Sequence, residues 1–176
     1  MTVDTLPGVN ANLVRVGGLF AVAAGVLEIL AGLRLFDQNP AITELLYVVT
    51  DLCCLPAILA WYLFQQTKVQ TSLGLWGFLL MFLGTAFIAG PSAEVFGIAA
   101  YSLGVPVIGI GLAIMCFTSW QGKALPNWLT LFFLVSMVTM AASPTFSFLY
   151  QPISFGNLTY GICFLGLGFH LLGVRE

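Results

Sequence analysis

Six long apolar runs dominate this chain. They cover residues 13–36, 42–64, 73–90, 95–119, 125–147 and 155–174. A helix needs about 20 apolar residues to cross the ~30 Å hydrocarbon core of a bilayer. The runs lack the period-two alternation that strands of a transmembrane β-barrel require. The sequence therefore predicts an all-α polytopic membrane protein, a bundle of six transmembrane helices that forms one domain over residues 13–176.

The composition supports a membrane protein. Hydrophobic residues make up 60% of the chain and charged residues 7%, with a mean hydropathy of +1.03. Soluble domains carry about 25% charged residues. The five Lys and Arg residues are scattered singly, so they form no basic patch that would bind nucleic acid. We therefore expect the lipid bilayer, and not nucleic acid, as the partner.

The few cations predict an orientation. Residues 1–12 form a short polar tail without Lys or Arg, which argues against a cleavable signal peptide. Six spans place both termini on one side, and the cations on that side are Arg15, Lys68, Lys123 and Arg175. Arg34 lies on the other side. Because Lys and Arg near helix ends favour the cytoplasm, both termini are expected to be cytoplasmic.

The last four spans contain a weak repeat. Trp76 and Trp128 each precede an apolar helix that ends at a proline, and Phe-Gly-x-x-x-Tyr follows at 96–101 and at 155–160. A parallel repeat of two-helix units, as in some transporter folds, would give this pattern. The preference of Trp and Tyr for membrane interfaces would give it too. The sequence does not decide between these two explanations.

Two carboxylates inside the first two spans form the candidate site. Glu28 and Asp51 each lie about eight or nine residues from the loop that joins their helices, which is roughly 12 Å along a helix. An ionised side chain near mid-bilayer costs about 2.5 kcal/mol or more, so it is normally paired, protonated or hydrated. Arg34 lies on another face of its helix. We expect at least one carboxyl to be neutral at pH 7 and the pair to bind a proton or a cation.

Helical spacing predicts where these carboxyls point. Small residues share one side of the first helix with Glu28, namely Gly18, Ala21, Gly25 and Gly32. Small side chains let a neighbouring helix approach closely, so Glu28 should face the bundle. Glu44, Tyr47 and Asp51 form a polar stripe on the second helix, which we expect to face Glu28. Alternatively, a neutral Glu28 only hydrogen-bonds across the interface, to Tyr47 or Thr50.

Two further features concern helix packing and the mouth of a site. Glycines recur every seven residues in the fourth and sixth spans and predict packing seams, at Gly97, Gly104, Gly111, Gly161 and Gly168. Polar and aromatic residues near the outer ends of these helices are expected to rim a pocket. These residues are Glu94, Tyr101, Asn157 and Tyr160.

The single histidine, His170, lies near the cytoplasmic end of the last span. One histidine cannot supply both axial ligands of a b-type haem. His170 is either an axial ligand of one haem or chlorophyll, with Cys163 two turns away on the same face, or an interfacial hydrogen-bonding residue, which we favour. The four cysteines show no CxxC spacing. The sequence therefore assigns no metal site, and it leaves any cofactor unknown.

Three functional hypotheses follow. The first is binding or transport of a small ligand, proton or cation through an outward-facing polar site between the first two helices. The second is an accessory or structural subunit that associates with other membrane subunits or with itself, holding pigment, quinone or lipid. The third is a membrane-embedded enzyme acting on a lipid. The sequence contains no nucleophile–base pair and no phosphate-binding loop, so an enzyme is the least favoured class.

Overall fold

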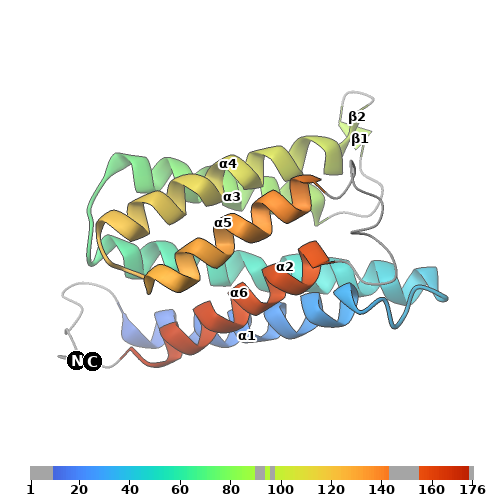
Figure 1. Ribbon diagram of the computed structural model, residues 1–176, viewed down its shortest axis with the longest axis horizontal. Helices are drawn as coiled ribbons and strands as arrows, with labels where there is room; N and C mark the ends of the chain where they lie inside the picture. Colours follow the sequence, from blue (N-terminus) through green and yellow to red (C-terminus); the bar gives the residue numbers. More distant parts are fainter. Residues whose placement is uncertain (1–9, 90–93, 96–97, 143–154, 175–176) are drawn as a thin grey trace.

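The computed structural model describes residues 10–89, 94–95, 98–142 and 155–174, and it is helical almost throughout (Figure 1). Within these described ranges there are six helices, namely α1 (Ala11–Gly32), α2 (Pro40–Gln66), α3 (Ser72–Ile88), α4 (Ala100–Gln121), α5 (Asn127–Ala142) and α6 (Phe155–Leu172). Two short strands, β1 (Glu94–Val95) and β2 (Ile98–Ala99), pair antiparallel between α3 and α4. The prediction of an all-α chain with six helices is confirmed.

Four of the helices are long and apolar enough to cross a membrane. They are α1, α2, α6 and the 103–121 part of α4. The apolar helices α3 and α5 are shorter, at 17 and 16 residues, or about 25 Å each at 1.5 Å per residue. These lengths and compositions support an integral membrane protein.

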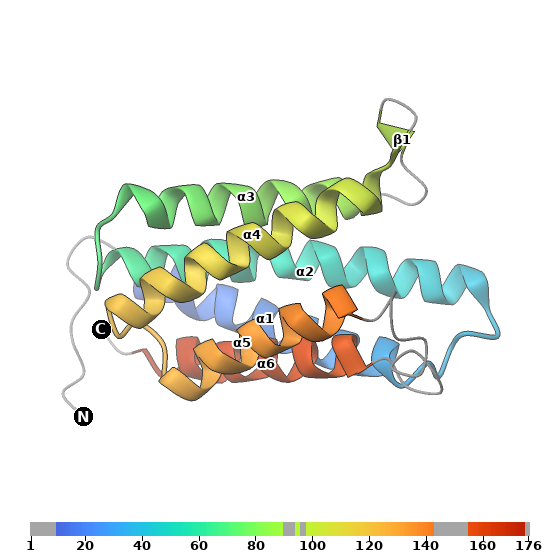
Figure 2. The same ribbon diagram turned by 45° about the horizontal axis from the view of Figure 1, so that its top comes forward.

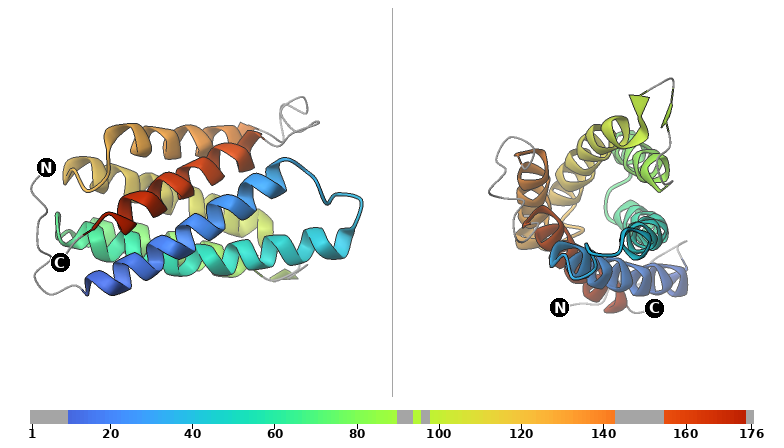
Figure 3. Two further views of the ribbon diagram at one scale, coloured as in Figure 1. Left: turned by 90° about the horizontal axis from the view of Figure 1, so that it is seen from below. Right: turned by 90° about the vertical axis from the view of Figure 1, so that its right-hand side faces the viewer.

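The helices lie side by side and follow one another around a ring in chain order. Consecutive helices are neighbours, and α6 packs against α1 to close the ring (Figures 2 and 3). We call the end where α1 begins and α6 ends the terminal end. The end that holds the α1–α2 turn and the two strands is the far end (Figure 1).

Glycines lie along the interface between α1 and α6, which is the most extensive helix–helix interface among the described residues. A Cβ atom placed on Gly25 would lie 2.7 Å from the backbone oxygen of Gly161, and one on Gly18 would lie 3.2 Å from the oxygen of Gly168. The backbones therefore approach until almost no side chain fits between them. The predicted seam at Gly161 and Gly168 is confirmed, and its partner is α1.

A second glycine seam joins α3 to α4. A Cβ atom on Gly104 would lie 2.9 Å from the oxygen of Gly84, and one on Gly111 would lie 2.8 Å from the oxygen of Gly77. The predicted seam of α4 is confirmed at Gly104 and Gly111, and Gly97 lies outside the described residues. The ring thus contains two tightly joined antiparallel pairs.

Large side chains fill the middle of the ring toward the terminal end. The rings of Trp61 and Phe133 stack with their centroids 5.0 Å apart. The indole Nε1 of Trp61 donates a hydrogen bond to Ser119 Oγ at 2.9 Å, and Gln65 Nε2 donates to Thr118 Oγ1. These contacts join α2 to α4 and α5 across the ring.

Two helix ends differ from the sequence prediction. The first helix ends at Gly32, before the predicted residue 36, because Arg34 adopts a left-handed backbone with φ of 56° and pairs with Asp37 within the turn. The fourth helix begins at Ala100 and not at 95, because the two strands precede it. Asn39 caps α2 by accepting a hydrogen bond from the Ile42 N–H at 3.3 Å, and Pro40 occupies the first position, which needs no donor.

Candidate functional site

Glu28 lies at the interface between α1 and α6. Glu28 is only 8% exposed. The small residues on the same side of α1 are buried as well. A Cβ atom on Gly161 of α6 would lie 3.0 Å from Glu28 Cβ. The structure thus turns Glu28 into the bundle, as the spacing predicted, because the glycines around it admit the backbone of α6.

Asp51 approaches Glu28 from α2. It is half-buried, and it lies close enough to Glu28 for the two charges to interact. Among the described residues, neither carboxyl group takes part in a salt bridge. The structure therefore brings both predicted carboxyls together and places no basic side chain in contact with them.

The rest of the polar stripe on α2 lies nearer the far end. Glu44 is exposed, and Tyr47 is 41% exposed. The buried Thr50 donates its hydroxyl to the carbonyl of Leu46 at 2.7 Å, within its own helix. The stripe therefore runs from the exposed first turns of α2 to the half-buried Asp51, which lies within electrostatic range of Glu28.

Helix α6 supplies two more polar groups to this site. The side chain of Asn157 forms a hydrogen bond with Glu28. Tyr160, 7% exposed, lies close enough to Glu28, Asp51 and Cys54 for electrostatic interaction, and its ring packs edge-on against Phe164 at 4.9 Å. Both residues were expected at a pocket rim, and the structure places them beside the carboxyls.

We refer to Glu28, Asp51, Asn157 and Tyr160 as the carboxyl cluster. Sequence reasoning proposed a site between the first two helices and missed the direct contribution of α6. The glycine spacing could have predicted that α6 contacts α1, because Gly18 and Gly25 are separated by seven residues, as are Gly161 and Gly168. Helices with matching seams are candidates for the same interface.

The other two residues expected at the rim cannot be compared. Glu94 belongs to β1 and Tyr101 is the second residue of α4, both near the far end (Figure 1). Their side chains lie outside the described part of the structure. Their place in a pocket mouth stays a prediction.

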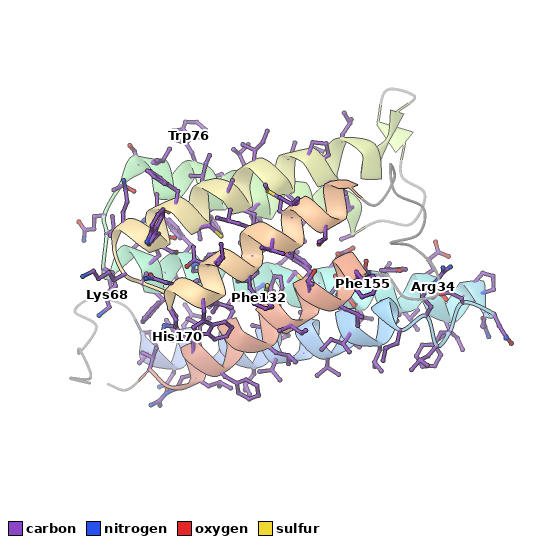
Figure 4. All side chains as sticks on the ribbon, viewed as in Figure 1. Arg34, Lys68, Trp76, Phe132, Phe155 and His170 are labelled. Carbon is purple, nitrogen blue, oxygen red and sulfur yellow. The ribbon has the colours of Figure 1, made fainter. Side chains whose placement is uncertain are left out.

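His170 lies far from the carboxyl cluster, at the terminal end (Figure 4). Its Nε2–H donates a hydrogen bond to the carbonyl of Ala124 at 3.1 Å, and its ring meets Phe64 edge-on at 5.4 Å. This arrangement suits the hydrogen-bonding role that we favoured. It also separates His170 from Glu28 and Asp51, so these groups cannot act in one reaction.

The described residues contain no group of three or more His, Cys, Asp or Glu side chains arranged to hold a metal ion. Comparison with known proteins gives no match, since no family model, curated protein or solved structure is significantly similar to this chain. The case for a function therefore depends on the chemistry of the carboxyl cluster.

Proposed function

We propose that this chain is a small membrane protein that binds and transports a proton or a small cation through the carboxyl cluster, which is reached from the far end. The observation that carries the proposal is the position of Glu28. It is buried on a helix seam, hydrogen-bonded to Asn157, and close to Asp51.

The energetics explain why such a site should take up positive charge. An ionised carboxylate deep in the bilayer costs about 2.5 kcal/mol or more, and a second one nearby adds repulsion. A bound proton or cation removes both penalties. In the described structure no salt bridge neutralises either group, so the neutralising charge has to come from solution.

The backbone of α2 adds a possible cation ligand beside Asp51. Pro56 lies inside this helix and has no N–H, so the carbonyl of Leu52 lacks its usual helical donor. Carbonyl oxygens released in this way coordinate ions in transporters with interrupted helices. Together with Asp51, this oxygen favours a small hard cation such as Na⁺ as well as a proton.

Access from the far end is supported by the gradient of burial along α2. Glu44 is exposed, Tyr47 is 41% exposed and Asp51 is half-buried. Asp37, in the α1–α2 turn, is exposed too. Acidic side chains at a site entrance raise the local concentration of cations.

The proposal includes six membrane crossings with both termini in the cytoplasm. Helices α3 and α4 pack closely along a glycine seam. If α4 spans the membrane, the shorter α3 beside it should therefore lie within the membrane too. Arg15 lies near the start of α1, Lys68 lies between α2 and α3, and Lys123 lies between α4 and α5. All three positions are toward the terminal end. At the far end, Arg34 is paired with Asp37, which strengthens the asymmetry that the positive-inside rule uses.

The proposed repeat of α3–α4 and α5–α6 stays a hypothesis. The two candidate copies pack differently: the glycines of α4 face α3, whereas Gly161 and Gly168 of α6 face α1. If the two units are copies of one ancestral pair, the glycine spacing was conserved between α4 and α6, but the helix that packs against these glycines is different.

Substitution of the carboxyl cluster tests the proposal. The full-length protein is reconstituted into liposomes, and proton and radioactive Na⁺ uptake are measured separately. Glu28→Gln and Asp51→Asn should each abolish uptake, because the neutral amides keep the shape of the side chain and lose the charge. Glu44→Gln, on the exposed part of α2, is the comparison variant. It removes an entrance charge and leaves both site carboxyls, so uptake should fall far less than in Asp51→Asn.

Uptake that persists in both Glu28→Gln and Asp51→Asn would overturn the proposal. Co-purification of the wild-type chain with pigment or partner subunits, without uptake, would instead favour an accessory subunit.

A membrane-embedded enzyme is the second candidate, and one observation favours it. Tyr160 lies within electrostatic range of both carboxyls, so an acid–base group meets them in one cluster. Tyr160→Phe separates the two functions. In a transporter both carboxyls remain, so proton or Na⁺ uptake should fall far less than in Glu28→Gln, whereas turnover of a lipid substrate would be abolished if the phenol transfers the proton.

A further inference from the structure

A pocket at the terminal end has no role in the proposed transport. It lies between the loop that joins α4 to α5 and the last turn of α6, and it is a half-open pocket of about 400 Å³. Its lining residues are Trp120, Lys123, Leu125, Pro126, Asn127 and His170. In a six-span orientation it lies where the helices leave the membrane.

The lining of this pocket is apolar on one side and polar on the other. Trp120, 59% exposed, contributes an aromatic surface of the kind that gathers at membrane interfaces. Lys123 contributes a cation, and Asn127 contributes an amide at the start of α5. The first turn of a helix also presents backbone N–H groups that favour anions. This combination matches a phosphate group attached to an apolar body.

The loop that forms the pocket is held firmly in place. The Ala124 N–H donates to the carbonyl of Ser119 at 2.9 Å, and the Ala124 carbonyl accepts the hydrogen bond from His170 at 3.1 Å. A Cβ atom on Gly122 would lie 1.8 Å from Val69 Cγ2, so the loop is also pressed against the α2–α3 connection. The pocket is therefore formed before any ligand arrives.

The charges of the molecule favour an anion at this end. Every acidic residue that the structure describes lies in the half of the bundle toward the far end, namely Glu28, Asp37, Glu44, Asp51 and Glu94. In contrast, Lys68 lies close enough to His170 for electrostatic interaction. Within the described residues Lys123 makes no salt bridge, so its charge is available to a ligand.

We propose that this pocket binds the phosphate of an anionic phospholipid headgroup from the leaflet at the terminal end. Lys123 neutralises the phosphate, Asn127 donates a hydrogen bond to it, and Trp120 packs against the glycerol and upper acyl carbons. The anionic lipids of a cytoplasmic leaflet would supply this ligand. The inference does not depend on transport by the carboxyl cluster.

Native mass spectrometry of the full-length protein tests the proposal. The protein is released from nanodiscs of phosphatidylcholine with a minor fraction of phosphatidylglycerol, and the lipid retained by each chain is identified. Wild type should retain one phosphatidylglycerol molecule. Lys123→Asn should lower that retention about fivefold, as expected for loss of one cation at an anionic surface. Asparagine is chosen because Lys123 has φ of 51°, which Asn adopts readily.

Lys68→Asn is the matched control, since it removes the same charge at the same end from a residue that does not line the pocket. Because Lys68 acts on the pocket only through its electrostatic interaction with His170, its loss of retention should be much smaller than that of Lys123→Asn. Asn127→Ala, a second variant, should also weaken retention.

Equal losses in Lys123→Asn and Lys68→Asn would overturn the proposal in favour of diffuse surface attraction. Retention that Lys123→Asn leaves unchanged would overturn it too. Addition of inorganic phosphate distinguishes the source of the ligand: the lipid should remain bound, and its displacement by inorganic phosphate would reassign the pocket to a free anion.

Discussion

The two halves of the bundle interior treat polar groups in opposite ways. In the half toward the terminal end, the indole N–H of Trp61 and the amide N–H of Gln65 each donate to a hydroxyl on α4. All four residues of these two bonds are fully or almost fully buried. In the half toward the far end, Glu28 and Asp51 lie within electrostatic range of each other, and Asn157 is the hydrogen-bonding partner of Glu28.

This difference distinguishes polar groups that stabilise the fold from polar groups that can bind a ligand. Neutral donors and acceptors such as Trp61 Nε1 and Ser119 Oγ satisfy each other and add stability without requiring a ligand. The Oε1 atom of Gln65 is the exception in this half, since it is buried without a hydrogen-bonding partner among the described residues. Two carboxyls of like charge cannot satisfy each other unless a proton or a cation enters. Helix α2 contributes to both halves, so one helix holds the packed centre at one end and the candidate site at the other.

The largest expected effect concerns the packed half. Trp61→Ala should lower the free energy of unfolding by about 3–5 kcal/mol, because it empties a fully buried site and leaves the Ser119 hydroxyl without its donor. Reversible unfolding in mixed micelles, as sodium dodecyl sulfate is added, measures this loss. Trp76→Ala is the control, since Trp76 is 61% exposed and its loss should cost far less. Equal losses would show that the centre of the ring is not packed as described.

The next effect concerns the seam that positions Glu28. Gly25→Ala should destabilise the protein by about 1–3 kcal/mol, because the new Cβ would lie 2.7 Å from the Gly161 oxygen and push α6 away. Gly109→Ala is the same chemical change in α4, where the nearest side chain lies 3.7 Å away. It should be neutral or stabilise the helix by up to ~1 kcal/mol. A neutral Gly25→Ala would contradict the close approach of α1 and α6.

The smallest effect compares one polar group from each half. Ser119→Ala should cost about 1 kcal/mol, because the buried Trp61 N–H loses its acceptor. Glu28→Gln should leave the free energy of unfolding unchanged within ~1 kcal/mol, since the amide can still bond to Asn157 and no charge is buried. The same micelle assay measures both. A large loss in Glu28→Gln would indicate that Glu28 is a structural hydrogen-bonding residue.

Much of the fold could be predicted from the sequence, because apolar runs report helices directly. The predicted run 42–64 became α2 at Pro40–Gln66, with Asn39 and Pro40 providing a clear start signal. The end of α1 was harder to predict. Leu33, Leu35 and Phe36 continue the apolar run, and only the left-handed backbone of Arg34 stops the helix at Gly32.

The partners of each helix were less accessible to sequence reasoning. The tight turn after α1 indicated that α2 is its neighbour, and it is. Contact with α6, more than 120 residues away, leaves no local signal apart from matching glycine spacing. For this reason the sequence correctly predicted that Glu28 points into the bundle but did not predict its neighbours on α6. Asn157 and Tyr160 were expected at a pocket rim instead of beside the carboxyls.

The seam between α1 and α6 has a consequence for biosynthesis. Helix α1 is translated more than 120 residues before α6, so Gly25 meets Gly161 and Glu28 meets Asn157 only after α6 has been made. During translation the carboxyl of Glu28 must therefore be sheltered by the insertion machinery, by lipid headgroups or by a proton. Truncated chains that lack α6 should be recognised by quality-control proteases as incompletely folded, because α1 then exposes the small-residue side that α6 covers.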